Sequence, residues 1–474
     1  MVVPIVQPTE PERSTSASNR PMALRRLGIA VGRPLFAVVL AMVAGIIVIM
    51  FTSPGSVSDR FSESISAYQA LFSGSFGSVQ SLSYTLVNVT PLIFAGLSVA
   101  IAFRAGLFNI GAEGQLAVGA LTASTIGIYA SHWPGWILIP VLIVSGALAG
   151  AIWGGIVGLL KAWRGAHEVV TTIMLNWVAF FVGDYLINGP LLDPNLANST
   201  KPLPPQATFP LISVFYNHTL GTFLPQIPAA QAQAYLADVT VFFALIALVV
   251  YWFLMSRTTF GYEVRVIGQN PKAAKYAGMP TRRNIILVMA IAGAFSGLGG
   301  VFHLMGQFPY YLTGSTFRID TVGFDAIGVA LLGHTTAIGV FFASLLFGGL
   351  RQGAGLMQLN ANVPGDLVFI IQALVLFSIA AEFLPAIQRR LPKGLFSRRR
   401  ASLATADGMG KVVGLPMNDN GNTQNEGFNS EDDNALAHYP PEGDADGESK
   451  GEKPDIGDSA AEHAPDQMQI AEEE

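Results

Sequence analysis

The 474-residue sequence contains no cysteine, and charged residues make up only 12% of it. Without cysteine the chain can form no disulfide, thiol nucleophile or cysteine metal site. Its seven histidines show no spacing typical of metal ligands. Charged residues usually make up about 25% of a soluble protein, and so few of them cannot cover a folded surface in water. These shortages exclude an ordinary soluble globular protein.

What the sequence has instead is apolar: 51% of its residues are hydrophobic and the mean hydropathy is +0.45. Lipid requires apolar side chains outside and backbone polar groups paired within helices. We therefore predict an all-α, polytopic membrane protein with about ten transmembrane segments, at residues 35–51, 84–103, 116–130, 136–160, 169–187, 239–255, 285–305, 322–332, 337–350 and 367–384.

Two of these segments, 322–332 and 337–350, are shorter than the ~20 residues that a full crossing needs. The GHTT between them is typical of a turn. We expect two short or broken helices there. Irregular backbone inside a membrane is tolerated only where protein or a water-filled path surrounds it.

Charge divides the chain into parts. Residues 1–400 carry 24 Lys and Arg against 14 Asp and Glu, whereas residues 401–474 carry 3 against 18. The acidic part is rich in Gly, Asp, Glu and Pro and has almost no aromatic residues, so it cannot bury enough surface to order its backbone. We expect a cytoplasmic N-terminal segment at 1–30, a transmembrane domain at 31–390 and a disordered acidic cytoplasmic tail at 401–474.

The distribution of basic residues predicts the orientation. If the N-terminus is cytoplasmic, 20 of the 24 Lys and Arg residues before position 401 fall on inside segments, as the positive-inside rule expects. Both termini are then cytoplasmic. The stretches 52–83 and 188–238 lie outside in this topology, the first as an amphipathic helix, and we expect both to cap the outer mouth.

The segment 103–120, FRAGLFNIGAEGQLAVGA, places Asn109, Glu113 and Gln115 among glycines between two apolar segments. An acidic side chain within a membrane is costly unless it is paired or hydrated, which favours Glu113 as a functional residue. It could instead sit at the cytoplasmic boundary and cap the N-terminus of the next helix. The sequence alone leaves both interpretations open.

Three further groups of residues are candidates. Asn176 and Trp177 lie deep in the segment that opens with HEVVTTIMLNW, where an amide either joins two helices or lines a solute path. Phe324 and Asp325 begin the short segment 322–332, and Asp325 is either a helix cap or a path residue. Glycines four residues apart, from Gly146 to Gly158, indicate close helix packing without any transport role.

The loop 257–283 carries six basic residues, which a solvated, lipid-facing loop would explain. Its NPKAAKYAGMP stretch carries a further pattern. Asn270 and Pro271 are typical of the start of a short helix, which continues through Ala273 and Ala274 and ends at Gly278. We predict a short helix that faces the cytoplasm.

Four stretches in the same order and spacing resemble the permease subunits of ABC importers for nucleosides and simple sugars, in the branched-chain amino acid/ribose-type family. They are FNIGAEGQ, HEVVTTIMLNWVA, GQNPKAAKYAGMP and GFDAIGVALLG. The resemblance covers about residues 30–390. It implies that the polar and aromatic candidates above line a translocation path, and that the loop residues Asn270, Pro271, Ala273, Ala274 and Gly278 dock on an ATPase.

The resemblance also implies a multi-pass plasma-membrane protein with neither catalytic residues, cofactor nor metal. Its partners would be a cytoplasmic ATP-binding subunit, a second permease of like fold, an extracytoplasmic substrate-binding lipoprotein and membrane lipid, with no nucleic acid. The sequence has no GK[ST] motif for the phosphates of ATP. Hydrolysis of ATP is therefore expected in a partner chain.

Two alternatives remain. The chain could be an ion-coupled secondary transporter that uses Glu113, Asp325 or Asp366 as its proton or sodium site. It could also be an ABC permease for ribose-like sugars or branched-chain amino acids. An intramembrane enzyme is disfavoured because the sequence lacks cysteine and paired histidines.

The topology can be tested by labelling single cysteines, since the chain has none of its own. We expect Asn217→Cys to react with a membrane-impermeant maleimide in intact cells. Cysteines placed in 1–30, 257–283 or 390–474 should react only after lysis. Labelling of Asn217→Cys only after lysis would contradict the predicted orientation.

Overall fold

The computed structural model describes residues 38–51, 56–219, 221, 225–314, 321–361 and 364–382. Helices account for most of them, and among these residues there are only isolated β-bridges and no strand. The predicted all-α class is confirmed. Contacts divide the chain into Met1–Pro392 and Lys393–Glu474, and all the described helices belong to the first unit. The segments predicted at 1–30 and 401–474 lie outside the described residues.

In the part of the chain that the structure describes, six helices are long and apolar enough to cross a membrane, as expected for a multi-pass membrane protein. They are α3 (Val79–Arg104), α5 (Gly135–Arg164), α6 (Glu168–Asn188), α9 (Thr240–Arg257), α12 (Thr281–Gly306) and α14 (Ala337–Ala361). Shorter apolar helices are Val38–Phe51, α13 (Val322–Leu332) and Leu367–Phe377, within α15 (Leu367–Glu382). The remaining predicted segment, 116–130, forms most of α4 (Ala112–Tyr129).

The prediction of two neighbouring short helices is half right. The segment 322–332 forms the short helix α13, but the prediction for 337–350 is wrong, because α14 continues to Ala361 and has 25 residues. The apolar run stops at Leu350 because Arg351 follows. The helix nevertheless continues past Arg351, whose guanidinium lies 3.5 Å from the Asp325 carboxylate, so its charge is paired.

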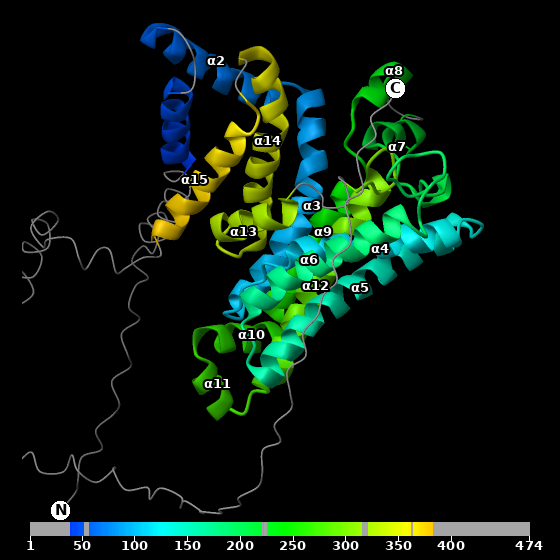
Figure 1. Ribbon diagram of the computed structural model, residues 1–474, viewed down its shortest axis with the longest axis vertical. Coiled ribbons are helices and arrows are strands. Elements are labelled where there is room, and N and C mark those ends of the chain that lie inside the picture. The colour runs from blue at the N-terminus through cyan, green and yellow to red at the C-terminus, as the bar shows by residue number, and fades with distance from the viewer. Residues whose placement is uncertain are drawn as a thin grey trace, which may run out of the picture. The chain divides into compact units, whose positions relative to one another are not determined.

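α12 packs against α5, α4 and α3, and Figure 1 shows it running beside α5 and α4. The closest approach, between α5 and α12, depends on glycine. A side chain on Gly150 would collide with the main chain of Gly293, and the reverse also holds. Because lipid gives helices no hydrophobic reason to associate, such close main-chain packing is what stabilises the pair. The glycines four residues apart thus allow close helix packing, as the sequence indicated.

The amphipathic helix expected within 52–83 is α2 (Val57–Phe76), which packs on α14 and α3 (Figure 1). Its first turn is closed by a capping box between Ser56 and Asp59. The Ser75 hydroxyl donates to the Gly349 carbonyl at 2.5 Å, joining the end of α2 to α14.

Residues 189–238, which we call the docked segment, carry the short helices η1 (Pro205–Ala207), α7 (Ile212–Thr219) and α8 (Ala229–Ala234). Main-chain hydrogen bonds attach this segment to residues 305–312. Thr200, Leu203 and Phe209 donate to the carbonyls of Leu312, Tyr310 and Met305 at 2.9, 2.9 and 2.8 Å. Its predicted role as an outer cap stays a prediction.

Asp238 closes the docked segment just before α9 begins. Its buried carboxylate accepts hydrogen bonds from the Thr240 amide at 2.7 Å and from the Gln307 side chain at 2.8 Å. Burial raises the pKa of Asp238 above its ordinary value, although the hydrogen bonds from Thr240 and Gln307 act in the opposite direction. The segment is thus anchored by a carboxylate at one end and by main-chain bonds along its length.

Candidate translocation site

Glu113 lies in the first turn of α4, but its side chain reaches α13. The Gly323 amide donates to the Glu113 Oε2 at 2.5 Å, and Glu113 is only 2% exposed. The N-cap residue of α13, Thr321, supplies no capping hydrogen bond from its own side chain. Glu113 therefore caps a helix 210 positions further along the chain, and its negative charge faces the positive end of that helix.

The main chains at this contact almost touch. A side chain on Gly323 would collide with the backbone of Glu113, so only glycine lets α13 begin so close to α4. The Ser296 hydroxyl donates at 2.5 Å to the carbonyl of Ala112, the neighbour of Glu113. Ser296 lies near the middle of the long helix α12. Glu113 therefore lies inside the bundle, beside the middle of α12, which favours the functional interpretation of its carboxylate.

Two more charges accompany Glu113. Asp325, in the first turn of α13, pairs with Arg351 of α14, and both side chains are nearly buried. Both interact electrostatically with Glu113. The one guanidinium pairs with Asp325, and the amide at the start of α13 gives the other carboxyl group, Glu113, its partner. The sequence prediction missed Arg351, although an arginine inside an apolar stretch is itself a signal.

Asn109 and Gln115 hold each other through a pair of side-chain hydrogen bonds at 2.9 and 3.0 Å. Asn109 also donates to the Ser98 hydroxyl of α3 at 3.0 Å. All three residues are buried. Their hydrogen bonds fasten the irregular segment 105–111 to α3 and fix where α4 begins. Nothing in the sequence marked Ser98 as a member of this network.

Asn176 joins α6 to the same place. Its side-chain oxygen accepts from the Gly114 amide at 2.9 Å and its nitrogen donates to the Ile110 carbonyl at 3.0 Å. The interhelical hydrogen bond, one of the two interpretations of this amide, is therefore present. Trp177 is instead 52% exposed and stacks on Phe181 with ring centroids 6.0 Å apart.

The structure thus brings most of the predicted path residues together around the starts of α4 and α13. Asn109 and Gln115 bond each other, Asn176 bonds the main chain between them, and Glu113 bonds the start of α13, where Asp325 pairs with Arg351. Trp177 and Phe324 do not join these contacts, because both lie on the outer surface of this chain.

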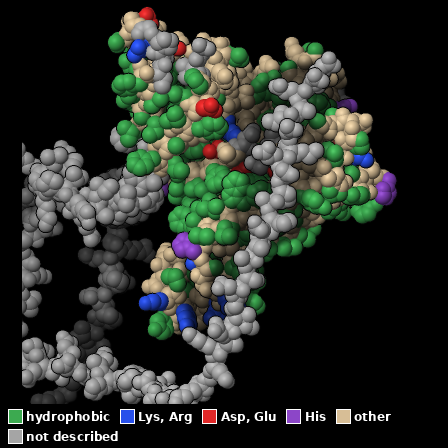
Figure 2. Space-filling model, viewed as in Figure 1, with side chains coloured by type: hydrophobic (Ala, Val, Ile, Leu, Met, Phe, Trp, Pro, Cys, Tyr) green, Lys and Arg blue, Asp and Glu red, His purple; other side chains and the backbone are tan. Residues whose placement is uncertain are grey.

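At one end of the bundle, α10 (Thr259–Gln269) leads into α11 (Pro271–Tyr276), the predicted short helix. The Asn270 side chain caps it by accepting from the Ala273 amide at 3.0 Å. Gly278 has the positive φ of 76° that a helix-ending glycine adopts. Figure 2 shows Lys and Arg side chains gathered over α10 and α11.

Exposure separates the residues of this loop into two kinds. Ala274 is fully buried, so it anchors α11 to the rest of the chain. Ala273, Tyr276 and Gly278 are exposed, and nothing lies within 4 Å of where a Gly278 side chain would begin. The exposed surface of this loop therefore includes Ala273, Tyr276 and Gly278 but not Ala274.

Residues 81–380 match the family described as branched-chain amino acid transport system / permease component. The chain is 39% identical to the guanosine ABC transporter permease protein NupP of Bacillus subtilis, over 74% of this chain and 93% of that protein. It is 34% identical to the nucleoside ABC transporter permease protein NupB of Lactococcus lactis, over 76% and 93%. It is 33% identical to the glucose ABC transporter permease protein TsgB13 of Haloferax volcanii, over 81% and 94%. No solved structure matches the chain.

The contact between Glu113 and α13 predicts how substitutions of Glu113 behave. Glu113→Gln keeps an oxygen for the Gly323 amide but loses the charge, so the folded chain should lose about 1–2 kcal/mol and still insert. Glu113→Leu leaves the Gly323 amide without an acceptor and should lower the stability of the folded chain by about 1–3 kcal/mol more. We expect solute uptake to fall in both variants.

Thermal unfolding of the purified chain and uptake at matched membrane levels measure these effects. Asp366→Asn is the control, because it removes an exposed carboxylate at the start of α15. Wild-type uptake by Glu113→Gln would show that the charge of Glu113 has no part in transport.

Proposed function

Since this chain belongs to the family of branched-chain amino acid transport system permease components, we propose that it is the permease subunit of an ATP-driven importer of nucleosides. Related sugars are the second candidate class, because one of the similar proteins is a glucose permease. The similarity to the guanosine and nucleoside permeases, at 39% and 34% identity, supports nucleosides first.

One observation in the structure supports a neutral solute. The start of a broken helix is where transporters commonly hold an anionic group of their substrate. In this chain the Glu113 carboxylate occupies the start of α13 and accepts from its Gly323 amide. A solute carboxylate would meet both Glu113 and the nearby Asp325 there. Nucleosides and sugars carry no charge, and this arrangement disfavours branched-chain amino acids.

The proposal includes partners. An ATP-binding subunit would supply the energy from the cytoplasm and dock on α11, a second permease would complete the path, and a substrate-binding lipoprotein would deliver the solute outside. The exposed Ala273, Tyr276 and Gly278 and the basic residues around them support α11 as the docking element. Both termini are then cytoplasmic.

An ion-coupled carrier is the rival function. Of its candidate acids, Asp366 is exposed at the start of α15, whereas Glu113 and Asp325 are already engaged by the Gly323 amide and by Arg351. Among the described residues, no three His, Asp or Glu side chains gather as a metal site would require.

Co-purification and reconstitution test the proposed function. The full chain, purified gently from its native membrane, should bring an ATP-binding subunit with it. Proteoliposomes containing this complex and its binding protein should accumulate guanosine when ATP is supplied on the side of the ATPase, and should do so without an ion gradient. Uptake that follows a proton or sodium gradient in the absence of ATP would instead establish the carrier.

The docking role of α11 is tested by adding bulk at Gly278. Gly278→Leu should cut ATP-driven uptake at least tenfold while the chain still inserts, because the larger side chain obstructs the contact with the ATPase. Gly165→Leu is a matched control. Gly165 also has a positive φ, of 66° against 76°, and also has nothing within 4 Å, but it lies at the end of α5.

Both substitutions carry the same backbone strain of about 1–2 kcal/mol. Uptake and ATPase activity are measured on equal amounts of membrane-inserted chain. They distinguish the effect of backbone strain, which both variants share, from the loss of docking, which only Gly278→Leu should show. Equal uptake by the two variants would contradict a docking role for this loop.

A further inference from the structure

Two interruptions in the helices lie next to each other on the side of the bundle where α10 and α11 lie. One is the segment 105–111 between α3 and α4, and the other is the turn 333–336 between α13 and α14. Gly268, in α10, packs against the main chain of Arg104 at the first interruption. Irregular backbone at membrane depth occurs where it lines a cavity or is buried in protein.

The turn 333–336 has a backbone conformation that residues other than glycine rarely adopt. His334 and Thr335 have φ values of 48° and 53°. Arg104 of α3 and Tyr251 of α9 both donate to the Thr335 carbonyl, at 3.0 and 2.7 Å. A strained conformation persists only where its surroundings fix it, and such turns cluster at functional sites. This turn is fixed from two helices at once.

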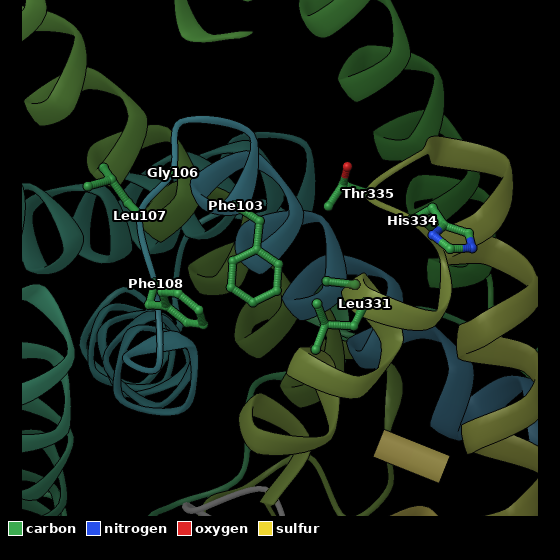
Figure 3. Close-up of a pocket in the computed structure, with 8 residues that line it drawn as sticks. Phe103, Gly106, Leu107, Phe108, Leu331, His334 and Thr335 are labelled. Carbon is green, nitrogen blue, oxygen red and sulfur yellow. The ribbon is translucent and has the colours of Figure 1, made fainter. Parts of the chain in front are cut away.

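A cavity of about 400 Å³ lies between the two interruptions. Figure 3 shows Phe103 and Phe108 on one side of it, with Leu331 and His334 on the other. Its volume lies within the range of sites for small molecules, which are mostly apolar with a few polar groups.

The lining suits a flat aromatic ring. Phe103 and Phe108 meet edge to face with their ring centroids 5.0 Å apart, and half of the Phe108 side chain remains exposed for contact with a ligand. Aromatic rings stack on aromatic side chains, and every nucleobase has a flat face that can stack in this way. His334 is exposed at the cavity and offers a ring nitrogen to the polar edge of a base. A sugar has no aromatic ring for this kind of stacking.

We propose that this cavity binds the planar heterocyclic base of a nucleoside, with Phe108 as the stacking residue and His334 at the polar edge of the base. The proposal rests on the proposed function and makes it more specific. The cavity is separate from the Glu113 contacts and lies on the side of α11, where the solute would rest before release from the permease.

Direct binding tests the role of Phe108. The full chain in lipid nanodiscs is titrated with radiolabelled guanosine and, separately, with radiolabelled glucose. Phe108→Ala should weaken guanosine binding about tenfold, the effect of losing one stacking contact. Phe108→Trp should restore it. Phe253→Ala is the control, because Phe253 is a similarly exposed phenylalanine on α9, outside the cavity.

A second measurement does not depend on removing the aromatic ring. Leu331→Cys places the only cysteine of the chain in the lining, and Phe253→Cys places one outside it. Guanosine should slow maleimide labelling of Leu331→Cys, glucose should not, and neither should affect Phe253→Cys.

The outcomes separate this inference from the proposed function. In one outcome the wild type binds guanosine, Phe108→Ala binds it equally well and guanosine does not slow the labelling of Leu331→Cys. That result would overturn the cavity assignment and leave the proposed importer function in place. Glucose binding by the wild type without guanosine binding would overturn both the assignment and the choice of nucleosides.

Discussion

A helix that begins inside a membrane leaves its first N–H groups without partners, and no water is present to supply them. In this chain the short helix α13 begins in the bundle, and the Glu113 carboxylate accepts its Gly323 amide. The arrangement also solves the opposite problem, since the positive end of α13 stabilises the charge of Glu113. The cost of a buried acid and the cost of an interrupted helix thus offset each other.

Much of the surrounding structure keeps this contact in place. The hydrogen bonds among Asn109, Gln115 and Ser98 fix the start of α4, and Asn176 holds it from α6. Arg351 neutralises Asp325 beside the same helix end. Each of these groups would be expensive to bury alone, and each has a partner within the bundle. The helix interruption is therefore supported by several neighbouring polar contacts rather than by one side chain.

Features that depend on residues close together in the sequence were predicted correctly. Apolar runs located the long helices, and Asn270, Pro271 and Gly278 marked α11 because capping depends on residues a few positions apart. The length of α14 was not predictable in this way, since the pairing of Arg351 with Asp325 arises only on folding. The partner of Glu113 lies 210 positions away, and the burial of Ala274 depends on how α11 packs. Sequence reasoning identified the polar candidates but could not pair them.

The docked segment has a consequence for how this protein can diversify. It is attached to residues 305–312 mainly through main-chain donors and acceptors, which every residue except proline can provide in full. Most of its side chains can therefore change without loss of its attachment, provided that anchors such as Asp238 remain. One scaffold can in this way carry different surfaces in related species while the helices of the bundle stay the same.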